Sequence, residues 1–549
     1  MKRPLRRSFL LPVLIPFVCV AVLAQEPAAP NAAAKTPYMV PMSDGVKLAT
    51  DVYLPSGAGP WPVILSRTPY GKNGARGAAA ATKGGYAIVL QDIRGRFESE
   101  GKGMAFINDG WGRNQDGYDT VEWVAKQPWC NGKIGTNGGS YLGCVQNLLV
   151  CTRPPHLVCS YANVAASNLY SQAAYIGGAF TKKLVEGWLE SNKWHPDNLK
   201  IMREHSSFDD YWKQIDCETM YPNAVTPMVQ KGGWYDIFSQ GTINSFMILQ
   251  NNGGPEAKGK QKVIMGPWTH GGRRGGGQGE LIYPPTAKSP EALSEVRWFE
   301  YWLKGVDNGI MKEPPVYYYV MGDTSDPNAP GNQWRTAASW PPPAKETPYY
   351  LRADAQLVPE APPANEPSQS YDYDPKNPVP TRGGNNLNIP AGPMDQRPVE
   401  NRPDVLLFTT PVLDQPLEVT GRVKVVLWAS SSAKDTDFTT KLCDVYPDGR
   451  SMLVLDSIIR ARHRDSIERE DFMEPGKIHK FEIDLWSTSI IFNKGHRIRV
   501  AISSSNFPRF VANPNTGAQS WDEKNPIVAK NTVHHDAEHP SHILLPVCR

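Results

Sequence analysis

The stretch GKIGTNGGSYLG, residues 132–143, decides the fold of this chain. A short run suited to a β-strand ends in two glycines and Ser140. The apolar residues that follow, Cys144, Val145, Leu148, Leu149 and Val150, predict a helix. A serine on a tight strand-to-helix turn needs small neighbours, because the turn strains the backbone and brings chain segments close together. The stretch therefore predicts a nucleophile elbow, although its second glycine, Gly143, comes one position later than the usual pattern places it. An ordinary glycine-rich turn is the alternative.

Strands and helices alternate on both sides of this elbow. Before the elbow, the pattern predicts a hairpin over Tyr38–Tyr53, buried strands over Trp61–Leu65 and Tyr86–Gln91, and a helix over Asp116–Lys126. After the elbow, it predicts buried strands over Val225–Asp236 and Lys262–His270. Alternation of this kind is typical of an α/β doubly wound sheet, whose ligands bind at the carboxyl ends of the strands.

Two other segments have different patterns. Residues 160–224 are rich in aromatics and alanines without a convincing strand, and predict a helical cap inserted into the α/β domain. Residues 345–549 alternate in strands with long loops, which predicts an all-β sandwich of jelly-roll type. The α/β domain then comprises residues 38–159 and 225–344.

The first 24 residues have the pattern of a secretory signal peptide. A basic start is followed by an apolar run from Phe9 to Leu23, and small residues favour cleavage after Ala24. A retained membrane anchor is the alternative, but the run is short and contains Pro12 and Pro16. We expect export to the periplasm or the medium, with no stable membrane insertion afterwards.

The composition excludes some partners. With 58 basic and 55 acidic residues, and no basic run interleaved with aromatics, nothing points to nucleic acid. Export permits disulfides among the seven cysteines that remain after cleavage, at most three of them, and no C-x-x-C spacing suggests a metal. The sequence is compatible with a homo-oligomer.

The spacing of three residues predicts the chemistry. In α/β-hydrolases the nucleophile, acid and base follow in the order Ser, Asp, His, each at the carboxyl end of a strand. Ser140, Asp236 and His270 meet both conditions. Ser140 would attack an acyl carbon, His270 would accept and return its proton, and Asp236 would hold the imidazole in the required tautomer.

An oxyanion formed in this way needs two hydrogen-bond donors. One is the backbone N–H of Tyr141, the residue after the nucleophile. For the second, the loop after Trp61–Leu65 offers the hydroxyl of Tyr70, although a Pro-Tyr pair in a loop is commonly only a turn.

Taken together, the motifs of this chain resemble those of the CocE/NonD family of serine hydrolases. That family includes bacterial cocaine esterase and α-amino-acid ester hydrolases, and Xaa-Pro dipeptidyl peptidases have a similar architecture. The resemblance rests on Arg67–Tyr70, Gln91–Gly95, Gly138–Gly143, Gly233–Asp236, Gly266–His270, Asp435–Phe438 and Ser503–Pro508. The family pattern Gly-x-Ser-Tyr-x-Gly accounts for the shifted glycine.

The resemblance implies an α/β-hydrolase domain with an inserted helical cap, followed by a C-terminal jelly roll. It also implies the triad Ser140, Asp236 and His270, with Tyr70 and Tyr141 forming the oxyanion hole. Phe238 falls where cocaine esterase has a phenylalanine against the acyl group, and we assign Phe238 and Trp234 to substrate binding.

Three readings of the function remain open. Ile237-Phe238-Ser239 follows the acid where α-amino-acid ester hydrolases have acidic residues, and no acidic anchor for a peptide N-terminus is recognisable. We therefore expect a small-molecule ester or amide substrate with a bulky, apolar acyl group. Amino-acid ester, β-lactam or Xaa-Pro hydrolysis is the alternative, and a secreted jelly-roll binding protein with an inactive scaffold is the non-enzymatic one.

No cofactor and no metal are expected. Asp435 and Asp437 suggest calcium, but two acids in a β loop are normally solvated, and we expect that here.

Overall fold

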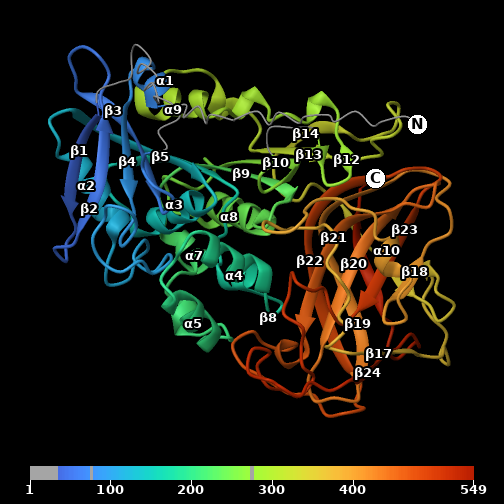
Figure 1. Cartoon of the computed structure of the whole chain (residues 1–549). Helices are drawn as coiled ribbons and strands as arrows, with labels where there is room; N and C mark the ends of the chain where they lie inside the picture. Colours follow the sequence, from blue (N-terminus) through green and yellow to red (C-terminus); the bar gives the residue numbers. More distant parts are fainter. Residues whose placement is uncertain (1–34, 74–77, 273–276, 549) are drawn as a thin grey trace, which may run out of the picture.

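The computed structural model of the chain describes residues 35–73, 78–272 and 277–548. The expected signal peptide, residues 1–24, lies outside them. Figure 1 shows two main bodies side by side, an α/β body and a β sandwich, with the cap helices α4, α5 and α7 at their junction.

A ten-stranded mixed sheet forms the α/β body. Its middle strands from β4 to β13 pair in parallel, whereas β1, β2 and β14 at the two ends pair antiparallel. In spatial order the strands are β1 (Lys35–Pro41), β2 (Lys47–Tyr53), β4 (Ala87–Asp92), β3 (Trp61–Thr68), β5 (Cys130–Gly139), β6 (Leu157–Asn163), β9 (Met228–Tyr235), β10 (Lys262–Thr269), β13 (Val316–Val320) and β14 (Gln333–Ala337). The parallel order brings the carboxyl ends of β5, β9 and β10 to one edge.

Helices cover both faces of this sheet (Figure 1). Alternate residues of β3 show why: Val63 and Leu65 pack in the cluster with the elbow helix, whereas Ile64 packs in the cluster with α9. The five helices are α1 (Ala78–Lys83), α2 (Asp116–Ala125), α3 (Tyr141–Thr152), α8 (Ser239–Asn252) and α9 (Glu295–Lys304).

The cap is mixed rather than purely helical. It contains a π-helical turn η1 (Tyr170–Ala174), a small hairpin of β7 (Tyr175–Ile176) and β8 (Ala179–Phe180), and then α4 (Lys182–Ser191), α5 (Asp197–Glu204), α6 (Asp210–Lys213), α7 (Cys217–Met220) and a 3₁₀ turn η2 (Tyr221–Asn223). The expectation of no strand from Ser160 onward was wrong. Residues 160–163 belong to β6 and pair with β5 and β9 in the centre of the sheet.

The C-terminal body is a two-sheet sandwich, as expected for a jelly roll. One sheet contains β15 (Lys345–Leu351), β16 (Leu357–Val358), β17 (Gln369–Tyr373), β19 (Leu417–Ser431), β22 (His479–Phe492), β24 (Ala529–Val533) and β25 (His542–Val547). The other contains β18 (Leu406–Thr409), β20 (Asp437–Val445), β21 (Ser451–Arg460) and β23 (Arg497–Ser503), and a short helix α10 (Arg397–Glu400) precedes β18.

The two bodies share a hydrophobic core. A single cluster of buried side chains runs from Trp234 and Tyr319 of the α/β sheet to Val423, Phe438 and Phe481 of the sandwich. Burial of this kind is the dominant favourable term in folding, so the two bodies stabilise each other.

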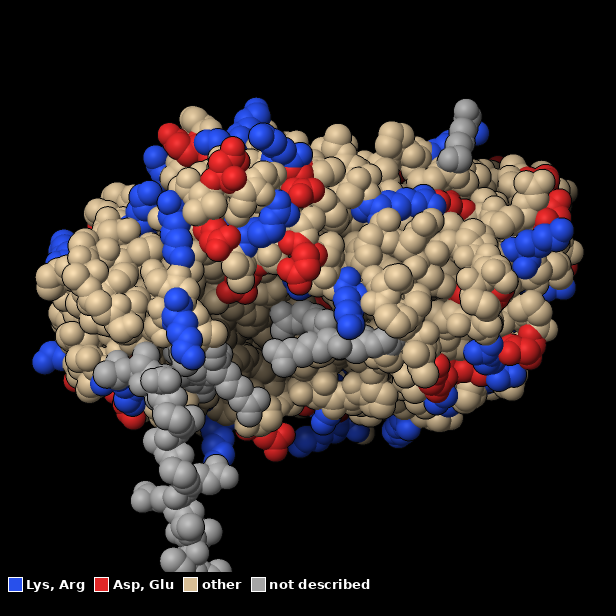
Figure 2. Space-filling view, turned by 90° about the horizontal axis from the view of Figure 1, so that it is seen from above, with Lys and Arg blue, Asp and Glu red and all other residues tan. Residues whose placement is uncertain are grey.

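The surface charges, the lengths of the helices and the cysteines bear on the expectations about partners, membranes and disulfides. Figure 2 shows Lys and Arg interspersed with Asp and Glu on the face seen from above, without an extended patch of one sign. Within the described ranges, no helix is long and apolar enough to cross a membrane. All seven cysteines that the structure describes are unpaired, and six of them are buried.

Candidate active site

Ser140 lies on the turn between β5 and α3, as the elbow motif predicts. Its φ of 61° and ψ of −126° place it in a conformation that a side-chain-bearing residue rarely adopts. The two neighbouring glycines are needed because other atoms lie too close for a side chain. A Cβ on Gly138 would lie 2.5 Å from the Leu142 Cβ, and one on Gly143 would lie 2.7 Å from the carbonyl oxygen of Asn163. The shifted glycine is therefore the one that lets α3 pass the end of β6.

The structure brings Ser140, His270 and Asp236 into one hydrogen-bonded chain. The Nε2 atom of His270 lies 2.9 Å from Ser140 Oγ, and its Nδ1 lies 2.7 Å from Asp236 Oδ2. Asp236 is fully buried and His270 is 8% exposed. The other carboxylate oxygen of Asp236 accepts the backbone N–H of Phe238 at 2.7 Å, which fixes the carboxylate in its turn.

Tyr141 holds the first turn of α3 in place. Its hydroxyl donates to Asp109 Oδ2 at 3.2 Å and accepts the backbone N–H of Phe106 at 3.0 Å. Burial raises the pKa of this phenol, so it stays protonated and can donate. The backbone N–H of Tyr141 belongs to the first turn of the helix, where N–H groups have no acceptor within the helix.

Tyr70 lies in the loop after β3 and lines the same cavity as Ser140. Its hydroxyl accepts the indole N–H of Trp188 at 3.2 Å. Loss of water around the hydroxyl raises its pKa, although hydrogen bonds with Trp188 and Ser140 act in the opposite direction. Arg96 stabilises this loop because its side chain donates a hydrogen bond to the carbonyl of Pro69 at 3.2 Å.

A cavity opens onto Ser140. Its described lining carries no Asp, Glu, Lys or Arg, and combines residues of the cap, the α/β body and the sandwich. The residues that line it are Tyr70, Phe106, Ser140, Tyr141, Cys144, Leu169, Ala173, Ala174, Leu184, Val185, Trp188, Met202, Trp212, Ile237, Phe238 and Leu387. An uncharged, largely apolar wall of this kind suits an apolar group of the substrate.

The two residues expected to bind substrate have different positions. Phe238 lines the cavity, and its ring stands edge-on to the imidazole of His270 with the centroids 5.7 Å apart. Trp234 is fully buried in the core shared with the sandwich, where its indole donates to the carbonyl of Tyr319 at 2.8 Å. It does not line the cavity, so we do not retain the substrate-binding assignment of Trp234.

Among the cavity residues that the sequence did not indicate, three come from separate parts of the chain. Trp188 comes from the cap, Phe106 from a loop before α2, and Leu387 from the sandwich region. Trp188 was within the aromatic-rich cap, some of whose aromatics had to reach the pocket. Leu387 had no signal, because nothing in the local pattern of a loop indicates that it folds back over a distant site.

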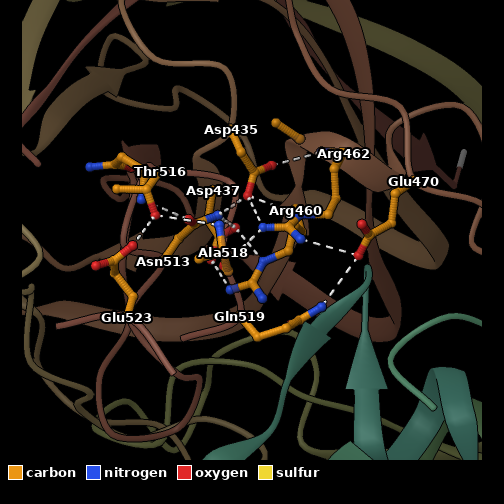
Figure 3. A network of polar contacts seen from close by, with 12 residues as sticks. Asp435, Asp437, Arg460, Arg462, Glu470, Asn513, Thr516, Ala518, Gln519 and Glu523 are labelled. Atoms are coloured by element: carbon orange, nitrogen blue, oxygen red, sulfur yellow. Dashed lines mark hydrogen bonds and ion pairs between the residues drawn. The ribbon is translucent and has the colours of Figure 1, made fainter. Parts of the chain in front are cut away.

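The structure contradicts the expectation that Asp435 and Asp437 are solvated. Both are buried, and Figure 3 shows them facing two arginines at the edge of the sandwich. Arg460 binds Asp437 through two hydrogen bonds of 3.0 Å, and Arg462 binds Asp435 at 2.8 and 3.0 Å. Asn513 donates to both carboxylates at 2.8 Å. The guanidinium groups of Arg460 and Arg462 therefore compensate the charges of the two carboxylates.

Among the described residues, no group of three or more His, Cys, Asp or Glu side chains is arranged so that it could hold a metal ion.

A serine, a histidine and an aspartate linked at the carboxyl edge of an α/β sheet define the class of serine hydrolases. Comparison with known proteins is consistent with this. Residues 44–198 and 188–272 match the X-Pro dipeptidyl-peptidase (S15 family), and residues 308–544 match the X-Pro dipeptidyl-peptidase C-terminal non-catalytic domain.

Similar proteins cover nearly the whole chain. The chain is 32% identical to cocaine esterase of Rhodococcus sp. (strain MB1 Bresler), over 93% of this chain and 98% of that protein. An α-amino acid ester hydrolase has a similar structure with a TM-score of 0.82 and 26% identity, covering 97% of this chain and 100% of the other. An aminopeptidase from the marine sediment archaeon Thaumarchaeota archaeon gives a TM-score of 0.83 at 25% identity, covering 96% and 99%. The chain belongs to the CocE/NonD family of serine hydrolases, as its motifs predict.

Proposed function

We propose that this hydrolase cleaves carboxylic esters with bulky, apolar or aromatic acyl groups, through an acyl-enzyme on Ser140. The observation that carries the proposal is the Ser140–His270–Asp236 chain at the floor of an uncharged, aromatic-lined cavity.

The reaction begins when Ser140 Oγ attacks the ester carbonyl and its proton passes to His270 Nε2. Asp236 accepts the Nδ1–H of the imidazole, which keeps that tautomer and stabilises the imidazolium. His270 then gives the proton to the departing alcohol. In the second half, His270 takes a proton from water as the water oxygen bonds to the acyl carbon. The bond between that carbon and Ser140 Oγ then breaks, the acid leaves, and His270 returns the proton to Ser140 Oγ.

The tetrahedral intermediate carries a negative oxygen that two donors would stabilise. One is the backbone N–H of Tyr141 at the positive end of α3. The other is the hydroxyl of Tyr70. Since this oxygen already accepts the indole N–H of Trp188, its own proton is available for the oxyanion, and the raised pKa keeps that proton on the phenol.

The lining of the cavity favours esterase over aminopeptidase chemistry. A substrate with a free ammonium group requires a carboxylate or another acceptor that compensates its charge. The described lining contains no acidic side chain, and Ile237 and Phe238 occupy the positions directly after the acid. We therefore rank amino-acid ester, β-lactam and Xaa-Pro substrates below neutral aryl and alkyl esters.

Steady-state hydrolysis tests this proposal. Wild type and Ser140→Ala are compared on p-nitrophenyl acetate, butyrate and benzoate, with Ala-Pro-p-nitroanilide as the amide probe. We expect turnover of the esters that Ser140→Ala reduces to background, and slow or undetectable anilide cleavage. Equal ester rates for the two proteins would refute the nucleophile, and faster anilide turnover would refute the ester preference.

We also propose export, on the basis of the basic and apolar pattern of residues 1–24. Cell fractionation with N-terminal sequencing of the mature protein tests it. A mature chain beginning at Gln25 in the exported fraction is expected, and a full-length chain retained in the cytoplasm would contradict it.

A further inference from the structure

Asn385 belongs to a loop of the C-terminal region that reaches the α/β body. The loop lies between β17 and α10, and its two limbs are joined by backbone hydrogen bonds of 2.8 and 2.9 Å between Gly384 and Gly392. Asn385 is 7% exposed, and Leu387, two residues later, lines the cavity above Ser140. The family model that matches this region describes a non-catalytic domain.

The amide of Asn385 donates into the acid turn, which we define as residues 234–239. Its Nδ2 lies 2.6 Å from the carbonyl oxygen of Asp236, 3.1 Å from that of Trp234 and 3.3 Å from Ser239 Oγ. All three acceptors belong to the turn that carries the catalytic acid. A single side chain therefore connects both ends of this turn.

The acid turn has two backbone hydrogen bonds of its own, from Asp236 N–H to the carbonyl of Gly233 at 3.0 Å and from Ser239 N–H to that of Asp236 at 3.1 Å, and Asn385 adds support from outside the sheet. The register between β9 and β10 shifts between Gly266 and Thr269, so the regular ladder is interrupted where the turn begins. Because Phe238 N–H binds the Asp236 carboxylate at 2.7 Å, a movement of the turn also moves the carboxylate relative to His270.

We propose that Asn385 is a positioning residue for catalysis, which fixes the acid turn so that Asp236 meets His270. The inference rests on the proposed function of the triad. It gives the C-terminal region a part in the reaction beyond its share of the hydrophobic core, although Asn385 itself touches neither the substrate nor the reacting atoms.

Two variants test this role. Asn385→Ala removes the donor, and Asn385→Asp replaces it with a carboxylate that faces three acceptors. We expect kcat for p-nitrophenyl butyrate to fall about 10- to 100-fold in Asn385→Ala, since small misplacements in a catalytic site have effects of this size, and further in Asn385→Asp. KM should change less than kcat, because Asn385 itself does not line the cavity, although the acid turn carries Ile237 and Phe238, which do.

Asn388→Ala provides a matched control on the same loop. The Asn388 amide donates at 3.3 Å to the carbonyl of Lys183 in the cap, and not to the acid turn. We expect wild-type kcat from this variant. A second readout is the low-field proton NMR signal of the His270–Asp236 hydrogen bond, assigned by its absence from Asp236→Ala. The signal should broaden or disappear in whichever Asn385 variant folds, as judged by thermal unfolding, and persist in Asn388→Ala.

Three outcomes would overturn the inference. They are kcat within about twofold of wild type in both Asn385 variants, an equal loss in Asn388→Ala, and an unchanged low-field signal. Ser140→Ala, measured in parallel, separates this from failure of the proposed function. If Ser140→Ala retains turnover, the triad proposal fails; if only the Asn385 variants retain it, the positioning role alone fails.

Discussion

Replacement of Tyr70 by phenylalanine removes one of the two donors assigned to the oxyanion. The ring, which forms part of the cavity wall, remains, and only the hydroxyl that contacts Trp188 is lost. Loss of one such donor typically lowers kcat by about 10²–10³, or about 2.7–4 kcal/mol of transition-state stabilisation. We expect a loss in this range with KM changed by less than about threefold, because the ground-state carbonyl does not yet carry the charge that the hydroxyl would stabilise.

The assay is steady-state hydrolysis of p-nitrophenyl butyrate, together with the rate of fluorophosphonate labelling at Ser140. Tyr86→Phe serves as the control, since it deletes a buried hydroxyl without a hydrogen-bond partner on the other face of the sheet. A Tyr70→Phe variant with kcat within about threefold of wild type would show that the oxyanion does not depend on this hydroxyl. A rise in KM without a fall in kcat would assign Tyr70 to binding instead.

Three further predictions concern selectivity, stability and pH. Ala173→Leu adds bulk to the cavity wall, so kcat/KM for p-nitrophenyl benzoate should fall at least about tenfold relative to the acetate, and an unchanged ratio would place the acyl group elsewhere. Arg460→Met leaves Asp437 buried and uncompensated and should cost about 3–5 kcal/mol in urea unfolding, whereas Lys480→Met, in an exposed ion pair, should cost less than about 1 kcal/mol; equal losses would contradict the structural role of the network. Burial, with the nearby charge of Glu218, raises the pKa of Asp216 to about 6, so the folded state binds this proton more tightly than the unfolded state does. Asp216 therefore stabilises the fold below about pH 4 and loses this contribution as the pH rises through about 6, an effect of about 3 kcal/mol. Asp216→Asn, which keeps a good helix N-cap, should abolish this part of the slope in unfolding free energy between pH 4 and 6.5, and an unchanged slope would assign it to another group.

The fold was predictable because its signals are local. Alternating apolar runs and the glycines around Ser140 mark the strands and the elbow wherever they stand in the chain. The juxtaposition of Ser140, Asp236 and His270 was also predictable, because strand order in this fold brings the three residues to the same edge of the sheet. The beginning of the cap was wrong because residues 160–163 are strand β6, buried in a sheet whose neighbours come from distant segments.

The parts of the site that come from elsewhere in the chain were not predictable. Leu387 and Asn385 belong to an irregular loop about 150 residues after the acid, and no periodic pattern records where such a loop folds back. Asp435 and Asp437 suggested a solvated loop, since their partners Arg460 and Arg462 belong to another segment and meet them only in the folded sandwich. Trp234 has the motif position of a site residue, but its side chain points to the core because successive residues at a strand end alternate in direction.

Trapping of the acyl-enzyme tests the central claim most directly. The protein is mixed with p-nitrophenyl benzoate, quenched in acid within the first turnover and examined by intact and peptide mass spectrometry. We predict one benzoyl group per chain, located on Ser140, and none on Ser140→Ala. A benzoyl group on any other residue, or a burst of p-nitrophenol of the same size from Ser140→Ala, would contradict the mechanism.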